Sequence, residues 1–140
     1  MPAGVQVGNA AAAGDRFRGW FVGHFVEPPD DGRRTDAVSV RWGVHPAGEA
    51  RSGWAENAVA TTLSILVRGR FRITFADGEY LLAREGDYVL WPPGTPHHWR
   101  AEADSIVLTV RWPSQAGDSR DVPEPAAGVR PENQPGRGET

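Results

Sequence analysis

Apolar and polar residues alternate in several short runs along the middle of this 140-residue chain. Residues 38–42, 71–75 and 105–112 alternate with period two, the spacing of a strand with one buried face. Turn-forming residues stop such runs about every 8–12 positions, and Asp77-Gly78 between two of them predicts a hairpin. No helical period persists for more than about two turns. The pattern therefore predicts an all-β sandwich or barrel.

Composition divides the chain into one folded segment and two ends. Every aromatic residue lies between Phe17 and Trp112, so we expect residues 17–113 to form a single domain. Residues 1–16 are mostly small, and residues 114–140 are rich in Pro, Gly, Glu and Asp. Neither end carries enough apolar surface to offset the entropy of ordering it, so we predict that both are disordered.

Missing residue types exclude several chemistries. All 15 basic residues are Arg and there is no Cys, which excludes a Schiff-base lysine, a thiol nucleophile, a disulfide and a zinc finger. With a net charge of −3 and no dense basic stripe, nucleic acid is not an expected partner. No run reaches the roughly 18 apolar residues of a membrane span, and the first residues lack a basic segment. We therefore expect a cytoplasmic protein without a membrane partner.

The most informative segment is Gly-Asp-Tyr-Val-Leu-Trp-Pro-Pro-Gly-Thr-Pro-His at residues 86–97. Gly94 permits a sharp reversal after one strand, and the next strand begins with His97. The segment resembles the second motif of the cupin family, which is a Gly, five residues, Pro, one residue, Gly, two residues and His. Upstream, residues 66–71 resemble the end of the first cupin motif, where a strand turns at Gly69. The Asn that closes the second motif is replaced by Ala101.

The resemblance covers about residues 36–113 and implies a fold and a site. The implied fold is a small cupin-type jelly roll, a double-stranded β-helix barrel, here with disordered termini. Such barrels carry a ligand pocket in the mouth and often form a homodimer. In metal-binding members, two His and a Glu from the first motif join the His of the second motif around a divalent ion.

The first motif of this chain departs from that ligand set, whichever way the residues are aligned. Counting back from Gly69 places the Glu position on Thr62 and the two His positions on Ala55 and Asn57, or with a shorter spacing on Glu56 and Ala58. Counting forward from Gly48 places the His positions on Trp54 and Glu56. Because no alignment yields a His pair, we expect no metal cofactor. The alternative is a site for Fe, Mn, Ni or Zn built from His97, Glu56 and a third group.

Strand parity predicts which side chains line the pocket, because residues two apart share a face. The tripeptide Val-Arg-Trp occurs at both 40–42 and 110–112, which places two Arg in one cavity if those strands pair and is otherwise chance. The opposite faces are strongly apolar and would pack against the other sheet, a terminal strand or a second subunit. The predicted lining consists of Thr62, Ser64, His97, Trp99, Thr109, Arg41 and Arg111.

These residues indicate a ligand class and leave the reaction open. An Arg at the rim can bind a carboxylate or phosphate, and Trp99 offers a flat surface to a ring, although each side chain also has an ordinary packing or solvent-facing role. His97 is the best candidate acid or base. We predict a protein that binds a small organic molecule, with metal-independent catalysis of the isomerase, cyclase or lyase type through His97. The alternatives are a metal-dependent dioxygenase with a rearranged ligand set and a non-catalytic ligand-binding or dimerisation module.

Overall fold

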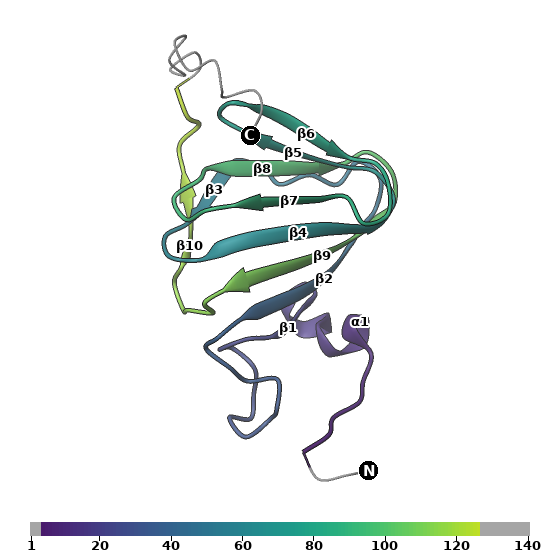
Figure 1. The fold of residues 1–140 in the computed structure, drawn as a ribbon, viewed down its shortest axis with the longest axis vertical. Helices are drawn as coiled ribbons and strands as arrows, with labels where there is room; N and C mark the ends of the chain where they lie inside the picture. Colours follow the sequence, from purple (N-terminus) through teal and green to yellow (C-terminus); the bar gives the residue numbers. More distant parts are fainter. Residues whose placement is uncertain (1–3, 127–140) are drawn as a thin grey trace.

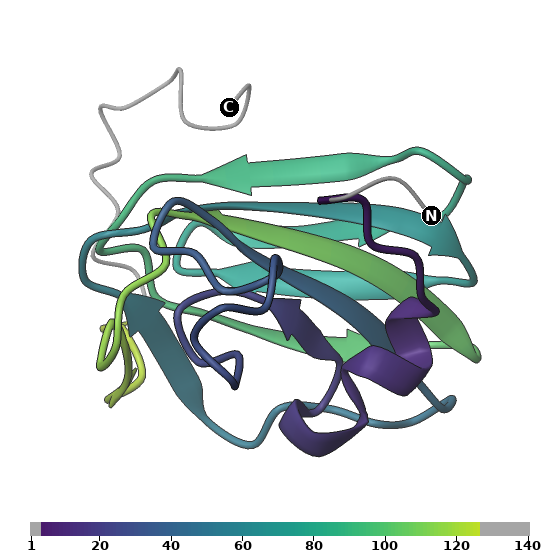
Figure 2. The ribbon, with the colours of Figure 1, turned by 90° about the horizontal axis from the view of Figure 1, so that it is seen from below.

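The computed structural model describes residues 4–126 as two five-stranded antiparallel sheets that face each other (Figures 1 and 2). The first sheet contains, in spatial order, β1 (Trp20–Val22), β2 (Ser39–His45), β9 (Ser105–Trp112), β4 (Thr61–Arg68) and β7 (Tyr88–Trp91). The second contains β10 (Ser119–Val122), β3 (Trp54–Asn57), β8 (His97–Ala101), β5 (Phe71–Phe75) and β6 (Gly78–Leu82). The prediction of an all-β jelly roll is confirmed.

The alternation in the sequence corresponds to the two faces of each strand. In β4, Thr62, Ser64 and Leu66 are buried between the sheets, whereas Leu63 and Ile65 lie on the other face and are only partly buried. Strand β9 pairs with both β2 and β4 along most of its length. In β4, two of the three inward-pointing residues are therefore polar, whereas the outward-pointing Leu63 and Ile65 are apolar.

Two turns set the strand registers. Asp77 and Gly78 join β5 to β6, and Phe75 pairs with Gly78, so the predicted hairpin is confirmed. Gly69, between β4 and β5, has a φ of +108°, a backbone conformation that strains any residue with a side chain. A Cβ there would also overlap the carbonyl oxygen of Asp104 and the side chain of Ser105. Glycine is therefore required at this turn.

The apolar core fills only part of the interior. It lies toward β5, β6 and β7, and the side nearer β2, β3 and β9 carries buried polar groups. Burial of these apolar side chains supplies the main stabilisation of the barrel. The core residues are Leu66, Phe71, Ile73, Phe75, Leu82, Trp91, Ala101 and Val107.

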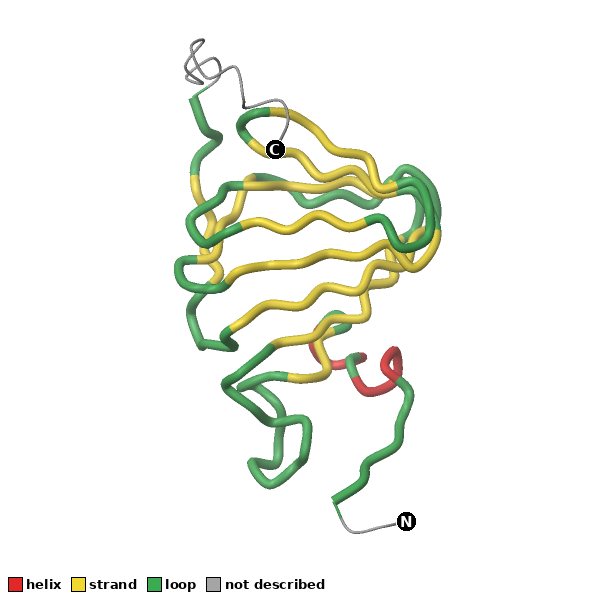
Figure 3. Tube along the Cα trace, viewed as in Figure 1, coloured by secondary structure: helices red, strands yellow, loops and turns green. Residues whose placement is uncertain are grey.

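Both ends contain more structure than their composition predicted. Residues of the first segment form α1 (Ala10–Ala13) and η1 (Asp15–Phe17), the helical turns in Figure 3, which pack near β1 and β2. Within residues 114–126, β10 pairs with β3, so the expected disorder does not hold for that strand. The rest of the predicted tail, residues 127–140, lies outside the described residues. No helix in residues 4–126 has the length and hydropathy that crossing a bilayer requires.

Candidate functional site

A row of inward-facing side chains crosses the first sheet. Arg111 on β9 lies opposite Ser39 on β2 and opposite Thr62 on β4, and Thr62 lies opposite Trp91 on β7. Ser39, Thr62 and Trp91 are buried, and Arg111 is half-buried. Strand alternation therefore brings a cation, two hydroxyl groups and an indole to one level of the interior.

Arg111 and Arg41 both lie over the ring of Trp20. Their guanidinium carbons are 4.4 and 5.9 Å from its ring centroid, respectively. The repeated tripeptide corresponds to paired strands, because Val40 lies opposite Val110 and both Arg side chains follow the inward parity. A ring on the face of a guanidinium leaves the in-plane N–H groups free to bind a carboxylate.

The positive charge at Arg111 has no paired carboxylate. Among the described residues, neither Arg111 nor Arg41 forms an ion pair, and Arg41 Nε donates to the backbone oxygen of Arg18 at 2.8 Å. Burial and, after it, the charge of Arg41 lower the pKa of Arg111 to about 10, so it stays protonated at neutral pH. Burial also lowers the pKa of Arg41. The barrel interior thus holds two Arg side chains, Arg41 and Arg111, and among the described residues no carboxylate is paired with either.

The buried carboxylate of Asp118 is occupied by the turn between β3 and β4. It accepts hydrogen bonds from the side-chain amide of Asn57 (3.0 Å), the backbone N–H of Val59 (2.5 Å) and the backbone N–H of Ala60 (3.3 Å). Its charge opposes the lowering of the Arg111 pKa. Asp118 therefore holds the turn between β3 and β4 in place. Because its hydrogen bonds go to that turn, it does not bond directly to the guanidinium of Arg111.

His97 is buried at the start of β8, as the motif predicted. Its Nδ1 donates a hydrogen bond to the backbone oxygen of Thr95 at 3.0 Å, so Nε2 carries no proton in the neutral ring. Its ring lies 4.8 Å from that of Trp91. Burial, and to a lesser degree the charges of Arg111 and Arg51, lower the pKa of His97 to about 4. His97 is consequently neutral at physiological pH and presents a hydrogen-bond acceptor.

Several buried polar atoms at this end of the barrel have no hydrogen-bond partner among residues 4–126. A buried polar atom without a partner costs about 1–3 kcal/mol, so such groups are normally satisfied by water or a ligand. Asn57 and Thr62 are 2% and 0% exposed. The atoms are Arg111 Nε, Thr62 Oγ1, Asn57 Oδ1 and Trp91 Nε1.

A pocket with a volume of about 470 Å³ opens beside Arg111. Arg111, Asn57 and Ser39 line it from three strands, and Trp20 lines it from β1. Arg16 and Arg18 of the N-terminal segment also line it and add positive charge. This volume suits a small molecule, since ligand pockets span about 300–1,000 Å³.

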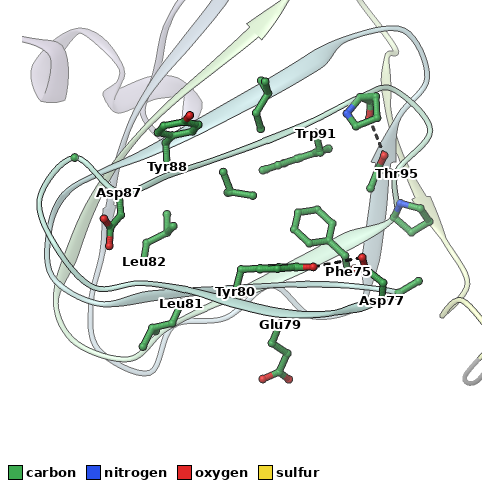
Figure 4. A pocket seen from close by; sticks show the side chains of 16 residues that line it. Phe75, Asp77, Glu79, Tyr80, Leu81, Leu82, Asp87, Tyr88, Trp91 and Thr95 are labelled. Atoms are coloured by element: carbon green, nitrogen blue, oxygen red, sulfur yellow. Dashed lines mark hydrogen bonds between the residues drawn. The ribbon is translucent and has the colours of Figure 1, made fainter. Parts of the chain in front are cut away.

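A larger hollow of about 1030 Å³ lies between the edge strands β6 and β7. Figure 4 shows Phe75, Tyr80, Leu82 and Trp91 pointing into it, with Glu79 pointing away. Its charged lining residues are all acidic, and the Tyr80 hydroxyl donates to one of them, Asp77, at 3.3 Å. The hollow therefore does not suit an anion, in contrast to the pocket at Arg111.

The residues at the implied metal positions do not fit a divalent ion. The structure selects the first of the alignments, because Ala55 and Asn57 are buried and Ala55 pairs directly with His97. That leaves one imidazole, an amide and the hydroxyl of Thr62 as donors, with a guanidinium close enough to lower the pKa of the imidazole. Transition metals bind sets of imidazole and carboxylate groups, and residues 4–126 contain no cluster of three or more His, Cys, Asp or Glu that could hold an ion.

Glu56 does not join His97. It lies on the opposite face of β3 from Asn57 and accepts two hydrogen bonds from Arg120 on β10. Because adjacent residues of a strand point in opposite directions, the two alternative metal ligands cannot converge. In this structure the alternative pair of His97 and Glu56 is therefore not brought together.

The remaining predicted lining residues face inward but differ in their surroundings. Ser64 and Thr109 lie opposite each other one step below Thr62 and Arg111, with their hydroxyl oxygens 3.0 Å apart. Trp99 packs instead against the core, since its ring is stacked on Phe71 with centroids 5.2 Å apart. His45 contacts the same ring at 4.5 Å. Trp99 is thus already occupied by protein contacts, and it does not line the pocket beside Arg111.

Several residues of the site were not among the predicted lining, including Trp20, Asn57 and Asp118. Trp20 supplies the aromatic surface that the sequence suggested for Trp99, and Asn57 and Asp118 form the wall of the pocket. Asn57 occupies one of the implied His positions, which was a usable signal. No local sequence pattern indicated Trp20 or Asp118, because each contacts the site from a segment that is distant in the sequence.

Comparisons with known proteins agree with this architecture. The family model described as "Cupin domain" matches residues 42–112. No curated protein matches the sequence. The fold resembles an uncharacterised double-stranded β-helix protein from Klebsiella pneumoniae, with a TM-score of 0.55, 18% identity, and coverage of 63% of this chain and 76% of that one.

Two further solved structures show the same likeness. KdgF from Halomonas sp. has a TM-score of 0.53 and 20% identity, covering 59% of this chain and 74% of that one. A cupin superfamily protein from Desulfitobacterium hafniense has a TM-score of 0.52 and 23% identity, covering 58% and 72%. At these identities the likeness shows a shared fold, and the function must be argued from the residues of the site.

Proposed function

Because this chain belongs to the cupin family and residues 4–126 contain no metal-ligating set, we propose that it binds a small organic anion, a carboxylate, through Arg111 instead of through a metal ion. The observation that carries the proposal is the half-buried guanidinium of Arg111, which has no ion pair within residues 4–126 and borders a pocket of about 470 Å³. A cationic fork without a counter-ion is a recognition element for carboxylates.

The neighbouring groups suit the rest of such a ligand. Trp20 presents an aromatic ring on one side of the pocket, which favours a ligand with a planar or apolar body. Arg111 Nε is a free donor and Asn57 Oδ1 a free acceptor, so a molecule bearing both a carboxylate and a hydroxyl would satisfy both. The positive charge of Arg16 and Arg18 at the rim would attract the anion.

His97 is the group that could add a reaction to binding. Its Nε2 can accept a proton, although burial and, to a lesser degree, the charge of Arg111 lower its pKa to about 4 and make it a weak base; an anion bound near Arg111 would offset the second of these effects. Metal-independent acid–base catalysis is therefore the second candidate. It requires that His97→Asn abolish turnover of a bound acid while its binding persists.

Calorimetric titration of the full chain with benzoate tests the binding proposal. Benzamide has the same shape without the charge and serves as the ligand control. We expect benzoate to bind, benzamide not to bind, and Arg111→Gln to weaken benzoate binding by about 10- to 100-fold, the range for a hydrogen bond to a charged group. Arg100→Gln, an equal change of charge at an exposed position on β8, should leave the affinity unchanged.

Arg111→Lys is a second variant, in case Arg111→Gln fails to fold. It keeps the positive charge and removes the planar guanidinium. We expect this variant to fold and to bind benzoate more weakly than the parent chain does. We also expect the parent chain to prefer benzoate to phosphate and the variant to bind the two anions with similar affinity. Equal affinity for benzoate in the parent chain and both Arg111 variants would overturn the proposal. So would equal binding of benzamide and benzoate.

Metal analysis tests the metal-independent part separately. Protein purified without an affinity tag from metal-supplemented growth should contain less than about 0.2 equivalents of Fe, Mn, Ni or Zn, because a stable site needs about three protein ligands. One equivalent of any of these metals, lost in His97→Asn, would establish a metal site in place of the anion site.

A further inference from the structure

Two serines and a histidine form a continuous chain of hydrogen bonds at one side of the pocket beside Arg111. Ser39 Oγ donates to Ser114 Oγ at 2.6 Å, and Ser114 Oγ lies 2.7 Å from Nδ1 of His24. Ser114 Oγ also accepts the backbone N–H of His24 at 2.9 Å. A hydroxyl has one proton and two lone pairs, so both lone pairs of Ser114 are used and its proton is donated to Nδ1 of His24. We call these three residues the serine relay.

The hydrogen bonds of the serine relay all run in one direction, from Ser39 toward His24. A neutral imidazole that accepts at Nδ1 carries its proton on Nε2. The ring of His24 is therefore placed to take a proton that leaves Ser39 through the hydroxyl of Ser114. A base that withdraws the proton of a serine hydroxyl makes the serine oxygen a nucleophile. Binding of a carboxylate at Arg111 does not require such a relay.

Both ends of the serine relay border the pocket. Ser39 and His24 line it, and Ser114, which links them, is 4% exposed. Ser39 lies directly opposite Arg111 in the pairing of β2 with β9, so the two side chains share a face of the sheet. A Cβ at Gly23 would come within 2.9 Å of Ser114 Oγ and 3.0 Å of Ser39 Oγ, so glycine there keeps the space beside the hydroxyls free.

We propose that the serine relay makes Ser39 a nucleophile toward an ester of the organic acid that the pocket binds, so that the carboxylate is the product of ester hydrolysis. The proposal rests on the carboxylate site at Arg111. There the guanidinium would hold the carbonyl oxygen of the ester and then the negative charge that develops on this oxygen. The same guanidinium would hold the acid that the hydrolysis releases.

The reaction needs only the ester and water. Ser39 Oγ bonds to the carbonyl carbon while its proton passes to Ser114 Oγ and the proton of Ser114 passes to Nδ1 of His24. The bond from the carbonyl carbon to the alcohol oxygen then breaks, and the alcohol leaves with the proton returned through Ser114. Water attacks the acyl ester of Ser39 by the same proton transfers and releases the acid. One water is consumed for each ester cleaved, and no group is oxidised or reduced.

Hydrolysis of 4-nitrophenyl benzoate by the full chain, followed as release of nitrophenolate, tests the nucleophile. We expect saturable hydrolysis above the rate in buffer, and Ser39→Ala should reduce it to that rate. Ser105→Ala is the matched control, because Ser105 is 2% exposed, begins β9 far from Arg111, and donates to the backbone oxygens of Arg70 and Ala103. This control also removes a buried hydroxyl and should keep the activity.

Ser114→Ala and His24→Gln test the rest of the serine relay. Each should lower kcat by about 100-fold or more, the contribution of a general base, and leave the Kd for benzoate unchanged. Ser114→Thr keeps the hydroxyl and should recover most of kcat. If the hydrogen bonds only tie the segments together, kcat should stay within a few-fold of the parent value in variants that circular dichroism shows to be folded, and the proposal is then wrong.

Phenylmethanesulfonyl fluoride locates the nucleophile, because a serine oxygen displaces its fluoride and keeps a stable sulfonyl ester. The chain has neither Lys nor Cys to compete, so peptide mass spectrometry should find the adduct on Ser39. An adduct on another residue, or no ester hydrolysis above the buffer rate, would overturn the serine relay. Benzoate binding that persists in that case would leave the carboxylate site standing. Hydrolysis through Ser39 without benzoate binding would instead support the nucleophile and overturn the carboxylate site.

Discussion

The guanidinium of Arg111 lies 4.4 Å from the ring centroid of Trp20, although β2 separates their strands in the sheet. Arg41, on the intervening strand, approaches the same ring at 5.9 Å. The first strand of the chain thus completes a pocket whose cation comes from one of the last. A cation over an indole is stabilised by the charge distribution of the ring, by about 0.5–2 kcal/mol.

Replacing Trp20 by Leu should keep the fold and weaken anion binding. The ring orients Arg111, so its loss should raise the Kd for benzoate by about 3- to 30-fold, the equivalent of the cation–π energy. Calorimetric titration measures this change. Trp112→Leu removes an indole that is 41% exposed on the outer face of the sheet and should leave the Kd unchanged. Equal effects of the two substitutions would contradict the assigned role of Trp20.

Thr62→Val should stabilise the unliganded protein and weaken ligand binding. The Thr62 hydroxyl is fully buried without a partner among the described residues, and Val replaces it with a methyl group of similar size. Removing an unsatisfied buried hydroxyl should raise the free energy of unfolding by about 1 kcal/mol. Chemical denaturation measures the first effect and titration with benzoate the second.

The same change at Thr109 provides the control for Thr62→Val. The Thr109 hydroxyl is hydrogen-bonded to Ser64, so Thr109→Val should destabilise the protein. If Thr62→Val lowers the free energy of unfolding more than Thr109→Val does, the Thr62 hydroxyl has a hydrogen-bond partner in the folded protein. It would then not be available to bind a ligand.

Stability should fall between pH 6.5 and pH 4 because of His97. Burial lowers its pKa to about 4 in the folded protein, against an ordinary value of about 6.5. Between these values the unfolded chain binds more protons, so acid favours unfolding, and the stability present above pH 6.5 is lost as pH falls to 4. The shift corresponds to about 3 kcal/mol.

His97→Asn should reduce this pH dependence. The amide cannot titrate, yet its N–H can still donate to the backbone oxygen of Thr95. Burial also lowers the pKa of His45, so part of the acid sensitivity should remain in the variant. Denaturant unfolding at several pH values is the measurement, and an identical slope for parent and variant would show that His97 is solvated in the folded state.

Gly69→Ala should destabilise the protein by at least about 2 kcal/mol, because the added carbon is strained by its positive φ and overlaps Asp104 and Ser105. Gly86→Ala is the matched control, since its φ is +92° and no heavy atom lies within 4 Å of the place that the added carbon would take. We expect about 1 kcal/mol there, from backbone strain alone. Thermal or chemical unfolding that shows equal losses would mean that the β4–β5 turn relaxes around the methyl group.

Much of the barrel could be predicted from local sequence, since strand faces follow from alternation. That rule placed Thr62, Ser64 and Thr109 inside, and the Pro-Pro-Gly bend placed His97 at the start of β8. It also placed Trp99 inside but could not show that Phe71 and His45 would occupy its ring. Contacts between distant elements are not encoded in a local pattern.

Strand β10 was not predicted, for a related reason. Composition measures apolar burial, whereas Asp118 is held by hydrogen bonds from Asn57, Val59 and Ala60. Arg120 is likewise paired with Glu56 across β10 and β3. Polar contacts of this kind order a segment whose hydrophobicity alone would leave it unfolded.

The clasp that Asp118 forms with the turn after β3 determines where the domain can be shortened. The family match ends at residue 112, and a truncation there would strip the amides of Val59 and Ala60 of their acceptor and remove one border of the ligand pocket. Expression boundaries for this protein should therefore extend past Val122, and a trimmed version ending near residue 113 would be a poor substitute for the full domain in any binding assay.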